Sequence, residues 1–416
     1  AGQEFGGWSL NIHHSYDPQA RTLYLGDGRQ RNANIPGPVV DLLVEQNPCY
    51  SDPDGVLEGL PLGETCFRDI FDIDTGLDGN LYMILNACIV RIEPDMTVTR
   101  IGGLPEVSQP AICNGDFSGT LPLEGVASET IIGPKDIAAG PDGSVYFTDG
   151  NRIGRIRPDG MLEHIAGTGA SGANFDTGVA TEIDLNGHNH NDIAVGPDGS
   201  VYQSQYGSAG FLAIRRIDTN GELTIYYKPG GTGCTAGGFC ATQNSRLLDL
   251  TVGPDGRLYF RDDEAQVWAV ETDGALTPIG GFGPCDWSDP SRIGDCGDGG
   301  PAIDAQFYSI KGNLDVDRDG SLLLWDIRTV RRITPDGIVT RAAGEQRIDW
   351  SGEGQDIDGR PAAQIGFDTE WGAVMPDGTL LLSGGWKSIY GISPMMPGFT
   401  NDEVSIPSEN GSALYV

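Results

Sequence analysis

The sequence predicts an all-β fold, a β-propeller in which four-stranded antiparallel blades form a closed ring. Three observations support this prediction. A module of four short apolar segments recurs along the chain at spacings of 56 to 64 residues. Each module carries two turn signals, mostly Asp-Gly, 17 to 22 residues apart, as two consecutive hairpins require. Segments such as 144–148 alternate polar and apolar residues like half-buried strands. Such modules bury their faces only against neighbouring copies, which predicts a ring.

The first turn of each module sets the number of blades. Its marker glycines are Gly79, Gly143, Gly199, Gly256, Gly320 and Gly378. Glycine suits these turns because it alone adopts positive φ without steric cost. A degenerate copy at Tyr16–Tyr24 precedes them, so the count predicts seven blades. Six blades is the alternative, with the opening segment packed as an accessory.

One domain is expected over residues 1–416, because the repeat spans the chain. Residues 1–67, including the apolar run Val39–Val44, are interpreted as a divergent first blade. Residues 68–400 hold six clearer repeats, and 401–416 form an exit segment. The ring is expected to close through Trp8–Ile12 or through Trp386–Ile392.

The charge excludes one class of partner. Asp and Glu outnumber Lys and Arg by 59 to 26, which gives a formal net charge of −33. Such a chain repels phosphate over most of its surface, so nucleic acid is not an expected partner. The sequence has no apolar run of about 18 residues, so no membrane insertion is expected in this segment.

The cysteines favour an oxidising compartment, hence an extracellular or cell-surface location. None has the C-x-x-C spacing of a zinc or redox site. Pairing neighbours in sequence order predicts four local disulfides, although eight cysteines allow about 105 connectivities. These pairs are Cys49–Cys66, Cys88–Cys113, Cys234–Cys240 and Cys285–Cys296.

Two constellations could hold a metal. His188 and His190 have strand-like spacing ahead of Asp192, and the three could bind zinc or calcium. The alternative is that both histidines are ordinary loop residues, and no cofactor is otherwise expected. A second segment, Asp315–Asp326, has acids at calcium-loop spacing, but it coincides with the turn of its repeat and lacks flanking helices.

Three aspartates recur at one register of the inner strands: Asp136, Asp192 and Asp249. They could line a central channel as an acidic ring, or each could cap its own strand by accepting N–H bonds. No nucleophile motif such as G-x-S-x-G occurs in the sequence. The absence of such a motif favours a non-enzymatic module. The alternative is a channel-centred, metal-dependent hydrolase or lyase that uses His188, His190 and the acidic ring.

The sequence also resembles a known family. Three stretches carry the resemblance: the opening GGWSLNIHHSYDPQARTLYLGDG, repeats such as GPDGSVYFTD, and the loop Cys296-Gly-Asp-Gly-Gly300. These resemble the NHL-repeat propeller of teneurins and of teneurin-like Rhs proteins, which carry YD repeats. The resemblance implies a piece of a longer secreted or cell-surface protein, beside a YD-repeat shell in the same polypeptide. It also implies a non-enzymatic scaffold that binds another protein or a surface glycan. Asp298, Gly299 and Gly300 are the candidate interaction loop.

Overall fold

The fold was analysed in a computed structural model of the chain. It describes residues 15–17, 22–24, 30–31, 40–44, 59, 70–85, 87–93, 97–106, 113, 122–172, 177–185, 192–206, 212–227, 233–234, 240–241, 247–272, 274–281, 296–307, 313–326, 329–344, 362, 372–375, 378–384, 388–392, 405–407 and 413–415. Two compact units are present, one made of Ala1–Pro38 with Met395–Val416 and the other of Val39–Pro394.

The smaller unit contains two short antiparallel sheets among its described residues. β1 (Ser15–Asp17), β2 (Thr22–Tyr24) and β3 (Gln30–Arg31) form a three-stranded sheet in sequence order. β32 (Ser405–Pro407) pairs with β33 (Ala413–Tyr415). The degenerate turn marker at Tyr16–Tyr24 is therefore the β1–β2 hairpin, and it belongs to this unit.

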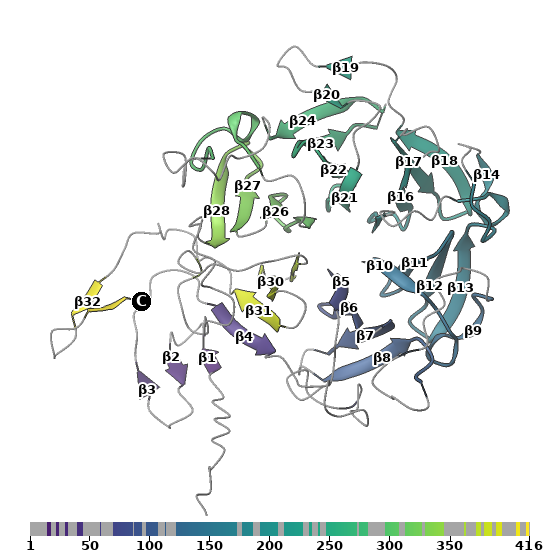
Figure 1. The fold of residues 1–416 in the computed structure, drawn as a ribbon, viewed down its shortest axis with the longest axis horizontal. Coiled ribbons are helices and arrows are strands. Elements are labelled where there is room, and N and C mark those ends of the chain that lie inside the picture. The colour runs from purple at the N-terminus through teal and green to yellow at the C-terminus, as the bar shows by residue number, and fades with distance from the viewer. Residues whose placement is uncertain are drawn as a thin grey trace, which may run out of the picture. The chain divides into compact units, whose positions relative to one another are not determined.

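The larger unit is a ring of six antiparallel blades (Figure 1). The first three are β5–β8 (Ile70–Thr75, Leu81–Leu85, Cys88–Ile92, Val98–Gly102), β10–β13 (Pro134–Ala139, Val145–Asp149, Arg152–Ile156, Met161–Ala166) and β15–β18 (Ile193–Val195, Val201–Tyr206, Leu212–Ile217, Glu222–Tyr227). The next two are β21–β24 (Leu247–Val252, Leu258–Asp262, Val267–Val270, Leu276–Gly280) and β25–β28 (Leu314–Val316, Leu322–Asp326, Thr329–Ile333, Val339–Gly344). We number the blades 1 to 6 in chain order.

Blade 6 closes the ring with strands from both ends of the unit. Its strands β29 (Gly372–Val374), β30 (Leu380–Gly384) and β31 (Ser388–Ile392) come from the C-terminal side. The fourth strand is β4 (Val40–Val44), which pairs antiparallel with β31. Figure 1 shows this strand, drawn in purple, beside the yellow β31. The prediction of closure at Trp386–Ile392 identified the correct strand, and Trp8–Ile12 lies outside the described residues.

The count of seven blades is wrong, and the alternative count of six is correct. Within the apolar run interpreted as part of a first blade, Val40–Val44 supplies the outer strand of blade 6. A hairpin signal reports only local pairing, so the count could not detect that the first hairpin lies in another unit. The all-β propeller with mostly four-stranded antiparallel blades is confirmed.

Short strands outside the four-stranded blades are attached to the ring at three places. β9 (Gly125–Val126) is a fifth strand on the outer edge of blade 2, and β14 (Gly178–Val179) is a fifth strand on blade 3. β19 (Gly233–Cys234) and β20 (Cys240–Ala241) form a two-stranded insertion between blades 3 and 4. In the described parts of the linkers between blades there are three one-turn 3₁₀ helices: η2 (Ala127–Glu129), η3 (Ala180–Glu182) and η4 (Ala302–Asp304).

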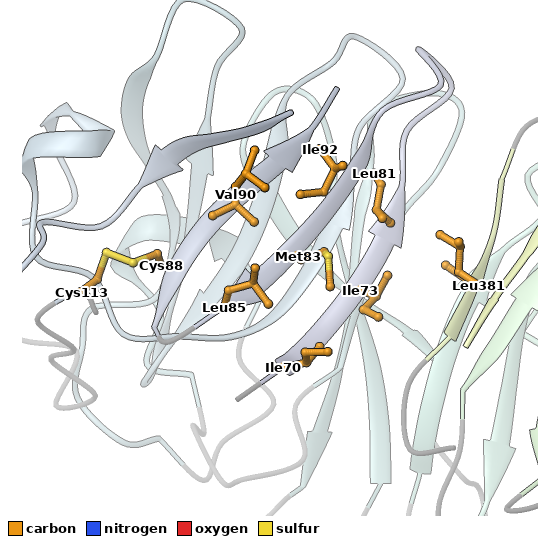
Figure 2. Packing of buried hydrophobic residues seen from close by; sticks show 12 residues of the cluster. Ile70, Ile73, Leu81, Met83, Leu85, Cys88, Val90, Ile92, Cys113 and Leu381 are labelled. Atoms are coloured by element: carbon orange, nitrogen blue, oxygen red, sulfur yellow. A yellow bond between two sulfur atoms is a disulfide. The ribbon is translucent and has the colours of Figure 1, made fainter. Parts of the chain in front are cut away.

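The core lies between the blades. Six apolar clusters are present, and each combines residues of two consecutive blades, the pair of blades 6 and 1 included. Figure 2 shows the cluster in which Leu381 of blade 6 faces Ile73 and Met83 of blade 1. Met83 is fully buried. Because the last cluster joins the last blade to the first, the ring hides every blade face from water.

The first-turn glycines behave as predicted. Gly143 has a φ of 79°, and its N–H donates to the carbonyl of Gly140 at 3.1 Å. Asp142 accepts the N–H of Ser144 at 3.1 Å, which is the side-chain bond expected of Asp in a turn. Gly140 is needed for a different reason, because a Cβ there would lie 2.9 Å from the ring of Tyr146.

Candidate functional site

The inner strands of all six blades surround a central cavity of about 190 Å³. Its walls come from β5, β10, β15, β21, β25 and β29, together with the first turns of several modules. An inner strand is the edge strand of its blade, so its channel-facing N–H groups lack a partner strand. The side chains that line this cavity must satisfy those groups.

Carboxylates occupy one register position on four consecutive inner strands. Asp136, Asp192 and Asp249 line the one cavity, as the acidic-ring interpretation expected. The same register also contains Asp72 in blade 1 and Asn313 in blade 5, which the sequence analysis did not select. Each lies four residues before the first residue of the first turn in its module, as Asp136, Asp192 and Asp249 do in theirs.

Two aspartates of blade 1 bind the inner strand of blade 2. Asp72 accepts the N–H of Ile137 through Oδ2 at 2.7 Å and that of its own neighbour Ile73 through Oδ1 at 2.8 Å. Asp74 accepts the N–H of Ala139 at 2.6 Å. These carboxylates therefore cap their own strand and also join two blades.

The same link recurs at two further interfaces. Asp136 of blade 2 accepts the N–H of Ile193 in blade 3 at 2.5 Å. Asp249 of blade 4 accepts the N–H of Leu314 in blade 5 through Oδ2 and that of its neighbour Leu250 through Oδ1 at 2.8 Å. The interpretation of these residues as strand caps is thus incomplete, because the second oxygen reaches the next blade.

Blade 6 is bonded on both sides. Asp315 of blade 5 accepts the N–H of Val374 at 2.9 Å, and Asn313 donates to the carbonyl of Gly372 at 2.6 Å. Thr75 of blade 1 donates its hydroxyl to the carbonyl of Val374 at 2.6 Å. Among the described residues, side-chain hydrogen bonds to an inner strand are therefore present at five of the six interfaces.

Asp192 is the exception in this register. Its backbone N–H donates to the Ser204 hydroxyl at 2.9 Å, within blade 3. Its Oδ2 atom is buried and accepts no hydrogen bond from the described residues. The positive charge of Arg261, a buried residue on β22 of blade 4, acts on Asp192 and on Asp249.

Burial dominates the electrostatics of the channel. It raises the pKa of Asp72 and of Asp315 to about 6, and it raises the pKa of Asp192 to about 8 with a further contribution from the charge of Asp72. The pKa of Asp136 lies well above its ordinary value because of burial and of the charges on Asp72 and Asp192. The side-chain interaction between Asp72 and Asp136 lowers the pKa of Asp72 and raises that of Asp136. Burial likewise raises the pKa of Asp249 and of Asp74.

The predicted metal ligands are only partly described. Asp192 lines the channel, whereas His188 and His190 lie outside the described residues. Within the described part of the chain, no group of three or more His, Cys, Asp or Glu side chains is arranged to hold a metal ion. In the calcium-like segment, the N–H of Gly320 donates to the carbonyl of Asp317 at 2.9 Å, which makes this segment the first turn of blade 5.

The candidate interaction loop is tied to the wall of blade 5. Asp298 accepts hydrogen bonds from Arg331 of β27, with the Nε contact at 2.9 Å. The Arg331 side chain is buried and also donates to the carbonyls of Gln306 at 2.6 Å and Cys296 at 3.1 Å. Its guanidinium lies 4.8 Å from the ring centre of Phe307. Asp298 therefore has a structural partner, while Gly299 is exposed.

This loop belongs to a repeated feature that the sequence analysis missed. In blades 2, 3 and 5 a linker runs along the outer strand and then buries an alanine of a short 3₁₀ helix. Each alanine accepts the N–H of the glycine after the preceding blade and donates to the glycine of its own second turn. The alanines are Ala127, Ala180 and Ala302, in the segments Gly125–Glu129, Gly178–Glu182 and Gly300–Asp304. These segments share the sequence pattern G-x-A-x-[DE]. This pattern recurs in three modules, so it could have been recognised from the sequence as a repeated feature, like the two turn signals.

One of the four predicted disulfides is confirmed, between Cys88 and Cys113. Cys296 is also disulfide-bonded. Cys234 lies directly opposite Cys240 in the β19–β20 pair. Cys49, Cys66 and Cys285 lie outside the described residues. Within the described residues, no helix is both long and apolar enough to cross a membrane.

Comparisons with known proteins support the family resemblance. Teneurin-3 of Danio rerio is 23% identical over 408 residues, which cover 78% of this chain and 14% of that protein. Teneurin-4 of Homo sapiens is 28% identical over 237 residues, which cover 53% of this chain and 8% of that protein. The chain is a distant homologue of teneurins over much of its length. No family model matches it.

A solved structure supports the fold. An auxiliary nutrient binding protein from Bacteroides ovatus superposes with a TM-score of 0.53 at 14% identity, covering 90% of this chain and 83% of that one. At this identity the likeness concerns the fold alone. The teneurin-like propeller spans only a small part of the length of the teneurins it matches.

Proposed function

We propose that this chain is the extracellular propeller of a teneurin-like or Rhs-like cell-surface or secreted protein, and that it docks another protein or a surface glycan without catalysis. In the longer polypeptide it would lie beside a YD-repeat shell. Distant teneurin homology over much of the chain supports this proposal.

The observation that carries the proposal is the use of the channel carboxylates. In enzymes, a buried carboxylate with a raised pKa commonly serves in acid–base chemistry or binds a metal. Here the oxygens of Asp72, Asp136 and Asp249 accept inner-strand N–H bonds across three interfaces. These residues hold a rigid ring together, and a rigid ring presents its rim and loops for recognition.

The rim offers equivalent apolar positions for docking. Val126 on β9 is 42% exposed, and Val179 on β14 is 47% exposed. Both occupy the same place in the linker repeat of adjacent blades, so an interaction surface could use them together. The Cys88–Cys113 disulfide supports an oxidising, extracellular location.

The test is binding of the purified chain to a second copy of itself, to the YD-repeat region of its own full-length protein, and to a glycan array. We expect saturable binding to one of these with a Kd of about 10 µM or tighter. Val126→Asp combined with Val179→Asp should weaken that binding at least tenfold. Leu77→Asp is the matched control, because Leu77 is 66% exposed on the first turn of blade 1, away from the linker repeat.

Two results would contradict the docking function. One is the absence of saturable binding to all three probes. The other is metal-dependent turnover of a lactone or ester that is lost on Asp192→Asn, which would establish the channel-centred hydrolase or lyase instead.

A further inference from the structure

The second turn of blade 3 carries a different residue pair from the second turns of blades 2 and 5. It contains Asn220-Gly221, whereas the other two contain Asp159-Gly160 and Asp336-Gly337. An asparagine that precedes glycine is open to deamidation, because glycine has no Cβ to hinder the attack of its backbone nitrogen on the asparagine side chain. Asn220 is exposed to water. This turn therefore places a reactive amide on the surface of blade 3.

Hydrogen bonds to Asp218 hold both reacting groups in the closed turn. The N–H of Gly221 donates to the carbonyl of Asp218 at 3.0 Å. The Nδ2 atom of Asn220 donates to Oδ2 of Asp218 at 3.4 Å, and the N–H of Asn220 donates to Oδ1 at 2.9 Å. Attack requires the Gly221 nitrogen to leave its acceptor and to lose its proton. The closed turn therefore slows the reaction, and local opening of the turn permits it.

The same turn is bonded to the linker repeat of blade 3. The carbonyl of Gly221 accepts the N–H of Ala180, the buried alanine of η3, at 2.8 Å. The next two residues of the chain, Glu222 and Leu223, pair with the two residues of β14. A change in the main chain at Gly221 therefore acts directly on the attachment of β14 and η3.

We propose that Asn220 is a modification site, at which spontaneous deamidation yields isoaspartate and releases β14 and η3 from the edge of blade 3. This site is independent of the proposed docking function. In the first step, the Gly221 nitrogen loses its proton and bonds to Cγ of Asn220, while the bond from Cγ to Nδ2 breaks and ammonia leaves. Water then opens the resulting succinimide ring. Opening at the main-chain carbonyl gives isoaspartate, and opening at the side-chain carbonyl gives aspartate.

Isoaspartate is the product that disrupts the turn. It routes the main chain through the former side chain, which adds one carbon between residues 220 and 221. The glycine then no longer matches its partners Asp218 and Ala180 together. Ordinary aspartate is tolerated here, because Asp159 occupies the equivalent position in blade 2 and the carbonyl of Gly160 still accepts the N–H of Ala127 at 3.0 Å. Release therefore depends on the altered main chain and not on the added charge.

Ionisation protects the aspartates of the equivalent turns. A carboxylate is a much weaker electrophile than an uncharged amide, so it resists attack by the nitrogen of the following glycine. A hydrogen bond from Arg157 lowers the pKa of Asp159 and keeps this carboxylate ionised, with Nη2 donating to Oδ2 at 2.8 Å. The amide of Asn220 has no such protection. The reaction is therefore expected in blade 3 and not in blade 2.

The test is incubation of the whole chain at pH 8 and 37 °C, followed by peptide mapping with mass spectrometry. Cleavage after Arg216 and Tyr226 releases a segment in which Asn220 is the only amide side chain, separate from the Asn-Gly pairs at 114–115, 186–187 and 410–411. We expect progressive conversion of Asn220, mainly to isoaspartate, and no isoaspartate at Asp159. Two results would overturn the proposal: no conversion of Asn220 under conditions that convert the guanidinium-unfolded chain, or equal formation of isoaspartate at Asp159.

Asp218 allows a test of the control that the closed turn has over the rate. Asp218→Ala removes the acceptor of the N–H groups of Asn220 and Glu222, which donate to Oδ1 at 2.9 and 3.0 Å. Conversion should then accelerate by about fivefold for each bond lost. Asp255→Ala is the matched control, because it removes a turn aspartate that accepts the N–H of Arg257 in blade 4. Equal acceleration by both variants would show that conversion follows global unfolding, which would overturn the assignment to this turn.

Hydrogen exchange at Ala180 measures the release of η3. We expect its amide to exchange at least about tenfold faster in the converted chain than in the fresh chain, with Ala127 unchanged. Asn220→Ser cannot deamidate, so its Ala180 amide should stay protected through the same incubation. Asn220→Asp adds the charge on a normal main chain and should also stay protected. Fast exchange in Asn220→Asp would overturn the isoaspartate explanation, and unchanged exchange in the converted chain would overturn the release.

Discussion

Aspartate has two functions in this chain, and the backbone atoms nearby decide which one a given residue performs. Turn aspartates such as Asp142 are exposed, and there the N–H and hydroxyl of Ser144 and the charge of Arg155 outweigh burial and lower the pKa. Inner-strand aspartates such as Asp249 are 9% exposed, so burial raises the pKa while two N–H groups hold the side chain in place. Both kinds contribute to stability, with opposite dependence on pH.

Asp249 allows a direct test of the inter-blade bond. Asp249→Ala leaves the N–H groups of Leu250 and Leu314 without their acceptor. Each unsatisfied buried N–H costs about 1–3 kcal/mol, so we expect the free energy of unfolding to fall by about 2–4 kcal/mol. Asp249→Asn keeps an acceptor oxygen and removes a buried charge, so its effect should be much smaller. Urea denaturation measures both, and equal losses would contradict the hydrogen-bond explanation.

Arg331 allows a test of the rim loop. Arg331→Met keeps much of the side-chain volume but leaves Asp298 and the carbonyls of Cys296 and Gln306 without their donor. We expect faster amide hydrogen exchange and faster proteolysis in residues 296–307, with the other blades unchanged. Arg332→Met on the same strand is the control, because its partners Asp317 and Asp319 lie at the first turn. Unchanged exchange in the loop would contradict the structural function of Arg331.

At the scale of whole strands, the ring depends on a pairing that joins distant parts of the sequence. β4 pairs with β31 at four register positions, from Val40 with Ile392 to Val44 with Ile389. Without β4, the outer edge of β31 would face water, and blade 6 would have three strands. Blade 6 also packs on both neighbours, so its loosening would expose two apolar clusters.

Two truncations test this closure. A chain that begins at Pro38 keeps β4, whereas a chain that begins at Glu45 lacks it. We expect the shorter chain to lose about 2–5 kcal/mol of unfolding free energy, since several net hydrogen bonds of about 1 kcal/mol each disappear together with side-chain packing. The chain that begins at Pro38 is the control. Equal melting temperatures for the two would show that β4 is dispensable.

The same pairing explains which parts of the fold could be predicted from sequence. The markers from Leu77 to Leu380 identify the six blades because each hairpin is a local structure. Assigning β4 to blade 6 requires a partner almost the whole chain away, which no local pattern reports. Asp72 and Asn313 were missed because the search followed the Gly-Pro-Asp-Gly turns, whereas their modules begin the turn with Gly76-Leu77 and Asp317-Arg318. The unpartnered oxygen of Asp192 depends on side-chain geometry and has no sequence signal.

At the scale of the whole molecule, the ring concentrates negative charge at its centre. The chain has a formal net charge of −33, and the cavity walls gather aspartates from all blades but the sixth. Protons retained by these groups reduce the repulsion between them. The stability of the ring is therefore linked to pH through its channel.

The sign of this linkage follows from the raised pKa values. Burial raises the pKa of Asp72 and Asp315 from 3.8 to about 6 and that of Asp192 to about 8, so between these limits the folded chain holds more protons than the unfolded chain. Stability from these groups is fully present below about pH 4. It is lost as pH rises through 6 and 8, by about 1.4 kcal/mol per pH unit for each extra proton held.

We therefore expect the free energy of unfolding to be larger at pH 5 than at pH 8, as measured by urea denaturation at constant ionic strength. Below pH 4 the trend should reverse, because Asp142 and the other arginine-paired turn aspartates, whose pKa values are lowered, then become protonated. Asp192→Asn should flatten the profile between pH 6 and pH 8, where Asp192 titrates, while Asp304→Asn should not. Added sodium chloride should stabilise the chain most at pH 8, where the unscreened repulsion is greatest. A profile that stays flat or rises from pH 5 to pH 8 would contradict the raised pKa values of the channel aspartates.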